Sequence, residues 1–108
     1  MKNKIGLYFQ LETEDPRDSY SAVKQTLSRL EQLEEEGLNV QYFELRLKKL
    51  KGLQKAKGVF MKLDGEGGTF IENEASSQWS QAFDDAFERI HHNLRSLNSS
   101  YSDSVQYV

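Results

Sequence analysis

The residues best suited to chemistry form a run of cations near the middle of the sequence. Half of the fourteen basic residues lie between positions 46 and 62, where no acidic residue occurs. Such a cluster can neutralise nucleic-acid phosphates, and binding then gains from the release of counterions. In the alternative interpretation these are solvated side chains of a strand edge, which discourage sheet-to-sheet aggregation. The run consists of Arg46, Lys48, Lys49, Lys51, Lys55, Lys57 and Lys62.

Two other pairs of side chains have the right types for chemistry, but their spacing does not support it. His91 and His92 resemble metal ligands, yet neighbours on a helix point about 100° apart and no third ligand is spaced to join them. Near a phosphate, the two imidazoles would instead gain positive charge as the pH falls. Asp84 and Asp85 have no partner base or nucleophile, so general acid–base catalysis is not indicated.

The sequence also shows no nucleophile–base pair, no metal-ligand cluster and no cofactor-binding loop. It contains no cysteine, which excludes a thiol nucleophile and a thiolate zinc site. The glycines at positions 65, 67 and 68 precede a predicted strand and not a helix, so a phosphate-binding loop is not indicated. We therefore predict that the protein is not an enzyme and binds no cofactor and no metal.

Two amphipathic helices are predicted to position the charged residues. The first begins with Asp15 as its cap and Pro16 as its first residue, and it ends at Gly37. Its predicted buried stripe is Tyr20, Val23, Leu27, Leu30 and Leu33. The second spans residues 77–97 and starts with a capping serine at position 76 or 77. Its predicted buried stripe is Trp79, Ala82, Phe83, Ala86, Phe87, Ile90, Leu94 and Leu97.

Alternating apolar residues predict four strands, at 5–11, 43–47, 59–63 and 69–74, with a glycine turn at 64–68. Residues 38–42 alternate in the opposite phase to 43–47, which indicates a late start or a bulge. The order β-α-β-β-β-α predicts an α+β two-layer sandwich, with both helices on one face of a four-stranded sheet. Glu44, Arg46 and Lys48 would then lie on the open face, as would Tyr8, which is either a surface tyrosine or a ring that stacks on a base. Residues 1–97 would form one domain and residues 98–108 a mobile polar tail.

The composition agrees with a single globular domain, since 37% of the residues are hydrophobic and 29% are charged. The net charge of −3 argues weakly against a nucleic-acid partner, so the local run of cations carries the prediction. No apolar run is long enough for a membrane span or a signal peptide. We expect a cytoplasmic protein without a membrane partner.

Three stretches, in this order, resemble the bacterial ribosome hibernation-promoting factor family, also called ribosome-associated inhibitor, ribosomal subunit interface protein or sigma-54 modulation protein. The stretches are LSRLE at 27–31, DGEGGTF at 64–70 and WSQAFDDAFERIHHNLR at 79–95. The resemblance covers residues 4–97 and corresponds to the short form of the family. It implies a fold like that of the double-stranded-RNA-binding domain.

The same resemblance implies a function without chemistry. Members of the family bind 16S rRNA in the decoding region of the 30S subunit, and they inhibit translation or stabilise idle ribosomes under stress. DNA is not an expected partner. The family's helix cations correspond to Arg29, Arg89, His92 and Arg95. Together with the central run, the predicted rRNA-binding residues are Arg29, Arg46, Lys48, Lys49, Lys51, Lys55, Lys57, Arg89, His92 and Arg95.

The sequence departs from the family where it carries less charge on the helices. Thr26, His91 and Ser96 stand where the family pattern suggests cations, and the first helix ends in glutamates. An alternative function is therefore a protein–protein interaction or weak self-association through the sheet face or an edge strand. The glutamates at 31 and 34–36 and the cations at 46–62 suit such a contact between copies.

Overall fold

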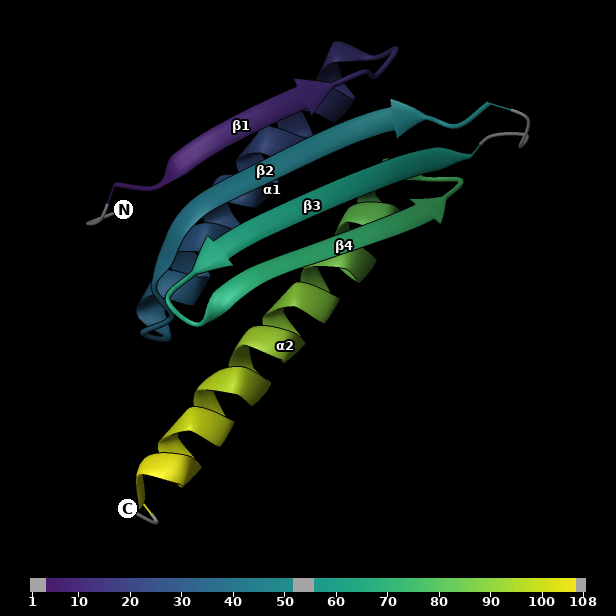
Figure 1. Cartoon of the computed structure of the whole chain (residues 1–108). Helices are drawn as coiled ribbons and strands as arrows, with labels where there is room; N and C mark the ends of the chain where they lie inside the picture. The colour runs from purple at the N-terminus through teal and green to yellow at the C-terminus, as the bar shows by residue number, and fades with distance from the viewer. Residues whose placement is uncertain (1–3, 52–55, 107–108) are drawn as a thin grey trace.

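The strands and helices follow the predicted order and form an α+β sandwich (Figure 1). The computed structural model describes residues 4–51 and 56–106, and the side chains as far as residue 97. The elements are β1 (Gly6–Leu11), α1 (Pro16–Glu35), β2 (Val40–Lys49), β3 (Lys57–Gly65), β4 (Gly68–Ser76) and α2 (Trp79–Gln106).

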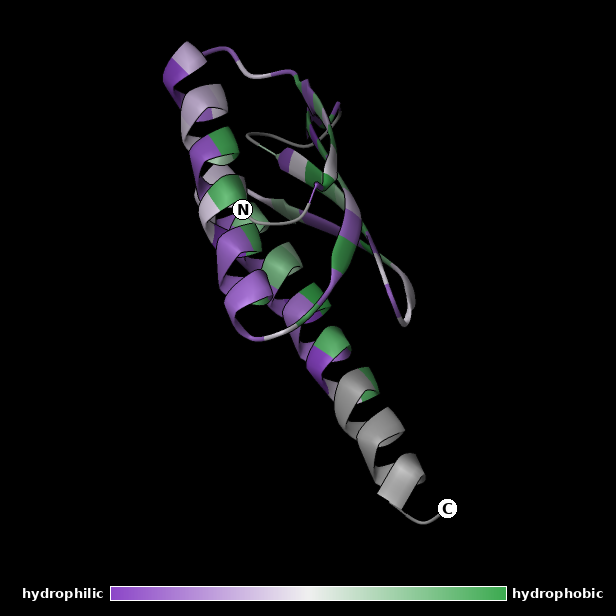
Figure 2. Cartoon of the chain, turned by 90° about the vertical axis from the view of Figure 1, so that its left-hand side faces the viewer, coloured by the Kyte–Doolittle hydropathy of each residue, from purple (hydrophilic) through white to green (hydrophobic). Residues whose placement is uncertain are grey.

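The four strands form one mixed sheet in the order β1-β2-β3-β4. β1 and β2 are parallel, whereas β2, β3 and β4 are joined as antiparallel neighbours. A parallel pair needs a crossover connection, and α1 provides it. Both helices lie on the same side of the sheet, so no described helix or strand covers the other face, which we call the uncovered face (Figures 1 and 2).

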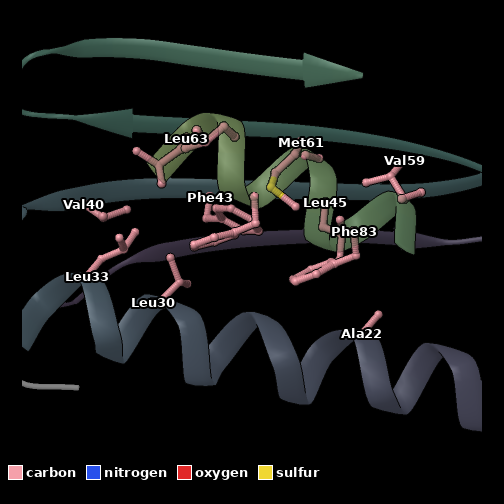
Figure 3. Close-up of a cluster of buried hydrophobic side chains, with 14 of the residues drawn as sticks. Ala22, Leu30, Leu33, Val40, Phe43, Leu45, Val59, Met61, Leu63 and Phe83 are labelled. Atoms are coloured by element: carbon pink, nitrogen blue, oxygen red, sulfur yellow. The ribbon is translucent and has the colours of Figure 1, made fainter. Parts of the chain in front are cut away.

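The core lies between α2 and the central strands. Inward-facing residues of β2 and β3 meet the apolar stripe of α2 (Figure 3), and the rings of Phe83 and Phe87 stack at 6.0 Å between centroids. Figure 2 shows the hydrophobic residues of the helices turned toward the sheet. The predicted stripe of α2 is confirmed except at its last member, because Leu97 is 40% exposed. The fully buried large side chains include Phe43, Leu45, Leu47, Met61, Leu63, Phe87 and Ile90.

The buried stripe of α1 differs from the prediction. Tyr20 is 71% exposed and Leu27 is 37% exposed, whereas Ala22 and Thr26 are buried together with the leucines at positions 30 and 33. The Thr26 hydroxyl donates to the carbonyl of Ala22 at 2.8 Å, which satisfies it inside the core. Thr26 is therefore a core residue and does not replace a surface cation. The prediction failed because the apolar spacing alone did not reveal that small residues allow close packing here.

The ends of α1 follow the sequence signals. The Asp15 carboxylate accepts from the Arg17 backbone N–H at 2.9 Å, as expected for a cap. Gly37 has a φ of +79°, and the backbone N–H of Leu38 donates to the Leu33 carbonyl at 2.9 Å. This Schellman arrangement needs a left-handed residue, which glycine supplies without strain. A register shift between Val40 and Tyr42 confirms that the phase change at the start of β2 reflects a bulge.

α2 begins and ends later than expected. It starts at Trp79, and the Ser76 hydroxyl accepts from the Gln78 backbone N–H at 3.3 Å just before it. It continues as helix to Gln106, past the predicted boundary at residue 97, and extends beyond the sheet (Figure 1). The mobility expected for residues 98–108 stays a prediction.

Candidate nucleic-acid interface

Part of the central run of cations gathers at one end of the sheet, where β2 ends and β3 begins, whereas Arg46 and Lys62 lie farther along these strands. We call this the loop end and define it by Lys48, Lys49, Lys51 and Lys57, of which Lys48, Lys49 and Lys51 are exposed. Lys55, also predicted to bind rRNA, lies outside the described residues. The structure thus brings sequence neighbours together at the end of the molecule that lies opposite the C-terminal end of α2 (Figure 1).

The loop-end lysines differ in their partners. Lys49 forms an ion pair with Glu14, and the Lys57 ammonium lies 5.6 Å from the centre of the Trp79 ring. Lys48 and Lys51 are exposed and have no carboxylate partner among residues 4–51 and 56–97. Their charges are therefore available to an outside anion.

Both helices begin beside the loop end. An open cavity of about 270 Å³ separates their first turns, with Asp18 and Gln25 of α1 on one side and Lys57, Trp79 and Phe83 on the other. The aligned peptide dipoles place partial positive charge at both helix starts. The start of α2 has no acidic residue in its first turn and therefore reinforces the positive potential of the lysines, whereas Asp15 and Asp18 offset it at the start of α1.

The predicted cation of α1 is engaged within the protein. Arg29 donates to Asp84 at 3.3 Å and to Glu88 at 3.1 Å. Its guanidinium also lies 5.4 Å from the centre of the Phe87 ring, and 27% of the side chain is exposed. Arg29 thus joins the two helices, and its charge is balanced by two carboxylates.

The predicted cations of α2 also have partners, with one exception. Arg89 pairs with Glu74 of β4 at 2.9 Å, and Arg95 pairs with Glu36 at 2.7 Å. His92 is exposed and lies in a shallow hollow beside Arg89. The helix surface is therefore more nearly neutral than its list of arginines suggests.

Glu36 holds the end of α1 to α2. It accepts from Arg95, and its other oxygen lies 2.7 Å from Nε2 of His91, whose side chain is 9% exposed. The hydrogen bond from Arg95, with the neighbouring His91, lowers the pKa of Glu36 below its usual value of 4.5. His91 is thus a packed residue that joins the helices, and it does not stand in for a surface cation.

The Glu36→Gln substitution tests this helix-to-helix contact through its pH dependence. Because the folded state lowers the pKa of Glu36, its contribution to stability is present above about pH 5 and is lost as the pH falls through the lowered value. We expect the variant to be less stable than the wild type in urea at pH 7, with a difference that shrinks below about pH 4. Glu35→Gln is the matched control, because Glu35 is exposed and has no described partner. Equal effects of the two substitutions would contradict the assignment.

The uncovered sheet face carries rings and cations in alternation. We call it the aromatic face and define it by Tyr8, Tyr42, Arg46, Phe60 and Lys62. The Arg46 guanidinium lies 5.1 Å from the centre of the Tyr8 ring and 5.9 Å from that of Phe60. The Lys62 ammonium lies 5.9 Å from the centre of the Tyr42 ring. Each cation of this face therefore has an aromatic neighbour.

Glu44 lies between Tyr42 and Arg46 on this face and forms hydrogen bonds with both. Its side chain is 12% exposed and accepts from the Arg46 guanidinium at 2.5 Å and from the Tyr42 hydroxyl at 2.8 Å. The hydrogen bond from Arg46 lowers the pKa of Glu44, and the bond to Glu44 raises the pKa of Tyr42. Gln10 accepts a further bond from Arg46 at 2.8 Å. The Glu44 carboxylate is thus bonded to residues of this face, while the Arg46 side chain remains 45% exposed.

The glutamates of α1 lie at the opposite end of the molecule from the loop end. Residues 31–35 form the end of α1 and Glu36 is its C-cap, beside the turn that joins β3 and β4 (Figure 1). The backbone N–H of Glu66 in that turn donates to the carbonyl of Asn39, which directly follows the helix. The molecule therefore has a basic end and an acidic end, which the sequence had shown only as separate segments.

Sequence reasoning missed two features of this surface. It did not foresee that Arg29 is balanced by acids, although Asp84 and Glu88 lie four residues apart and therefore on one helix face. It also missed Tyr42 as a member of the aromatic face, because Tyr42 precedes the main alternation of β2. Once the bulge is placed before it, Tyr42 shares a face with Glu44 and Arg46.

Two other features, a cluster of metal ligands and a membrane-spanning helix, are absent from the described residues. No group of three or more histidine and acidic side chains among them is arranged to hold a metal ion. Within the described part of the chain, no helix combines the length and apolarity that crossing a membrane requires.

Comparison with known proteins gives a structural match alone. No protein-family model and no curated protein matches the sequence. The crystal structure of the Protein Y N-terminal domain from Thermus thermophilus is similar, with a TM-score of 0.61 and 17% sequence identity. The similarity covers 85% of this chain and 96% of that one. The chain therefore has the α+β fold of the Protein Y N-terminal domain.

Proposed function

We propose that this protein is a non-enzymatic ribosome-associated factor. It binds 16S rRNA in the decoding region of the small subunit and inhibits translation or stabilises idle ribosomes under stress. The resemblance of residues 4–97 to the hibernation-promoting factor family supports the proposal, and the fold that this resemblance implies is the observed one.

The loop end is the observation that carries the proposal. Lys48 and Lys51 are exposed and unpaired in the described structure, and Arg46 and Lys57 lie close by. Binding to folded RNA requires cations that reach phosphates and a surface that fits the shape of the RNA. The loop end supplies the cations at a tip, where they can enter a channel.

The remaining predicted cations form the second part of the proposed surface. Arg29, Arg89 and Arg95 would contact phosphates by exchanging their carboxylate partners, and His92 would do so directly. Exposed ion pairs are weak in water because the solvent screens them, so a phosphate can replace the carboxylate at little cost. Lys49 would exchange Glu14 in the same way.

Sucrose-gradient co-sedimentation tests the proposal. At low salt we expect the purified protein to migrate with 30S and 70S particles and not with 50S subunits. Migration with 50S subunits alone, or with no particle, would contradict a role on the small subunit.

The two charged ends favour self-association as a second candidate function. The acidic end of one copy can meet the basic loop end of another, which is a head-to-tail contact that does not close on itself. Sedimentation velocity should then show assemblies that grow with concentration at low salt. A monomer at all concentrations would exclude this candidate.

A further inference from the structure

We propose that the aromatic face is a stacking platform for single-stranded nucleic acid. The face is free, because both helices cover the opposite side of the sheet (Figure 2). It adjoins the loop end, because Arg46 and Lys48 lie two residues apart on β2, but its rings are not part of the loop end. The choice of RNA as the natural ligand rests on the proposed function, whereas the stacking chemistry does not.

The sheet register places the rings and cations next to one another. Arg46 is the direct neighbour of Phe60 on β3, and Lys62 is the direct neighbour of Glu44 on β2. Tyr8 on β1 is the neighbour of Glu44 on its other side. The Arg46 guanidinium thereby comes to lie between the rings of Tyr8 and Phe60. The platform is thus built from three strands and is fixed by their backbone pairing.

The chemistry of this face suits bases joined by phosphates. Unstacked bases bind on aromatic rings and on the flat guanidinium of arginine. Tyr8 is 43% exposed, and Arg46 is 45% exposed although it also bonds to Glu44 and Gln10. Lys48 and Lys62 can meet the phosphates on either side of a stacked base. The rings of this face can therefore bind the bases of a single strand, and the neighbouring cations can bind the phosphates that join those bases.

A protein partner fits this surface less well. The centre of a protein interface is usually depleted of lysine and of acidic residues, although aromatic residues and arginine are enriched there, so it is Lys62 of this face and the adjoining Lys48 that fit a protein partner poorly. Here a cation lies next to every ring, within 6 Å of its centre in each recorded contact. Charge complementarity therefore favours a polyanion with aromatic groups, which is a single strand of nucleic acid.

Fluorescence anisotropy with a short labelled oligouridine tests the platform. We expect wild-type protein to bind the single strand at low salt, and to bind a hairpin duplex of similar length less tightly. Tyr8→Ala and Phe60→Ala should each weaken binding about tenfold, and Tyr8→Phe should retain it. Arg46→Lys should weaken binding although it keeps the charge, because it removes the flat group. Equal binding of oligodeoxythymidine also supports the platform, because stacking uses the base and not the sugar.

Ile71→Ala is the control on the same sheet face. Ile71 is 52% exposed and lies beside Lys62 without contributing a ring, so RNA binding should not change. If oligouridine does not bind, if the ring variants bind as the wild type does, or if the duplex binds equally well, the proposal is wrong. A dimer that Ile71→Ala and Tyr8→Ala both disrupt would assign the face to a protein contact instead.

The two proposals can fail separately. Ring variants that lose oligouridine binding but still co-sediment with 30S subunits would support the platform as a distinct surface. A wild-type protein that binds oligouridine but no ribosomal particle would support the platform and overturn the proposed function alone.

Discussion

The double substitution Lys48→Glu and Lys51→Glu is expected to weaken binding to the small subunit about a hundredfold, or roughly tenfold for each lysine. Each of these lysines is exposed and unpaired within the described structure, so a reversed charge would repel the phosphate that it now attracts. Lys49 is left unchanged because reversing it would also break its ion pair with Glu14. Binding constants from fluorescence titration with 30S subunits measure the effect.

The matched control is the double substitution Lys4→Glu and Lys24→Glu. Both residues are exposed and lie away from the loop end. Either pair of reversals changes the net charge from −3 to −7, because each reversal subtracts two. We expect the control to bind nearly as the wild type does. If both pairs weaken binding equally, overall charge and not the loop end governs association.

Phe87→Ala is expected to lower the free energy of unfolding by about 3–5 kcal/mol. Phe87 is 1% exposed, and its ring lies 6.2 Å from the ring of Phe43 and 6.0 Å from that of Phe83. Its removal also takes away the ring beneath the Arg29 guanidinium, and with it one contact between the helices. Because the total free energy of unfolding of a domain is typically about 5–15 kcal/mol, this loss would remove a large part of it.

Urea unfolding followed by circular dichroism measures this loss. Phe60→Ala is the matched control, since it deletes the same atoms from a half-buried position on the uncovered face. The control should lose about 1 kcal/mol, because less apolar area returns to water. A loss at Phe87 no greater than that at Phe60 would show that the core is not organised around α2.

The sequence predicted most of the fold because its local signals agree with the final packing. The stripe of α2 is aromatic and regular, and the turn residues at Asp15, Pro16 and Gly37 mark both ends of α1. The buried stripe of α1 was harder to predict, because Tyr20 and Leu27 have the right spacing but the wrong orientation. Only the packing against the sheet selects Ala22 and Thr26 in their place.

The candidate site was less predictable because it depends on contacts between distant residues. The partners of Arg29 and Arg95 lie more than fifty positions away along the chain, and no local pattern reveals such pairs. The loop end was found because its lysines are close in sequence. The alternation of the strands placed Tyr8 and Arg46 on the open face, but the position of Tyr42 there and the neighbours across the strands needed the register, which includes the bulge before Tyr42.

The measurement that tests the central claim most directly is the salt dependence of binding to purified 30S subunits. If Lys48, Lys51 and their neighbours bind three or four phosphates, the association constant should fall about a hundredfold between roughly 50 mM and 200 mM salt. The Lys48→Glu, Lys51→Glu variant should show a shallower slope. Binding that is absent at low salt, or that does not change with salt, would contradict a phosphate-binding ribosomal role for this protein.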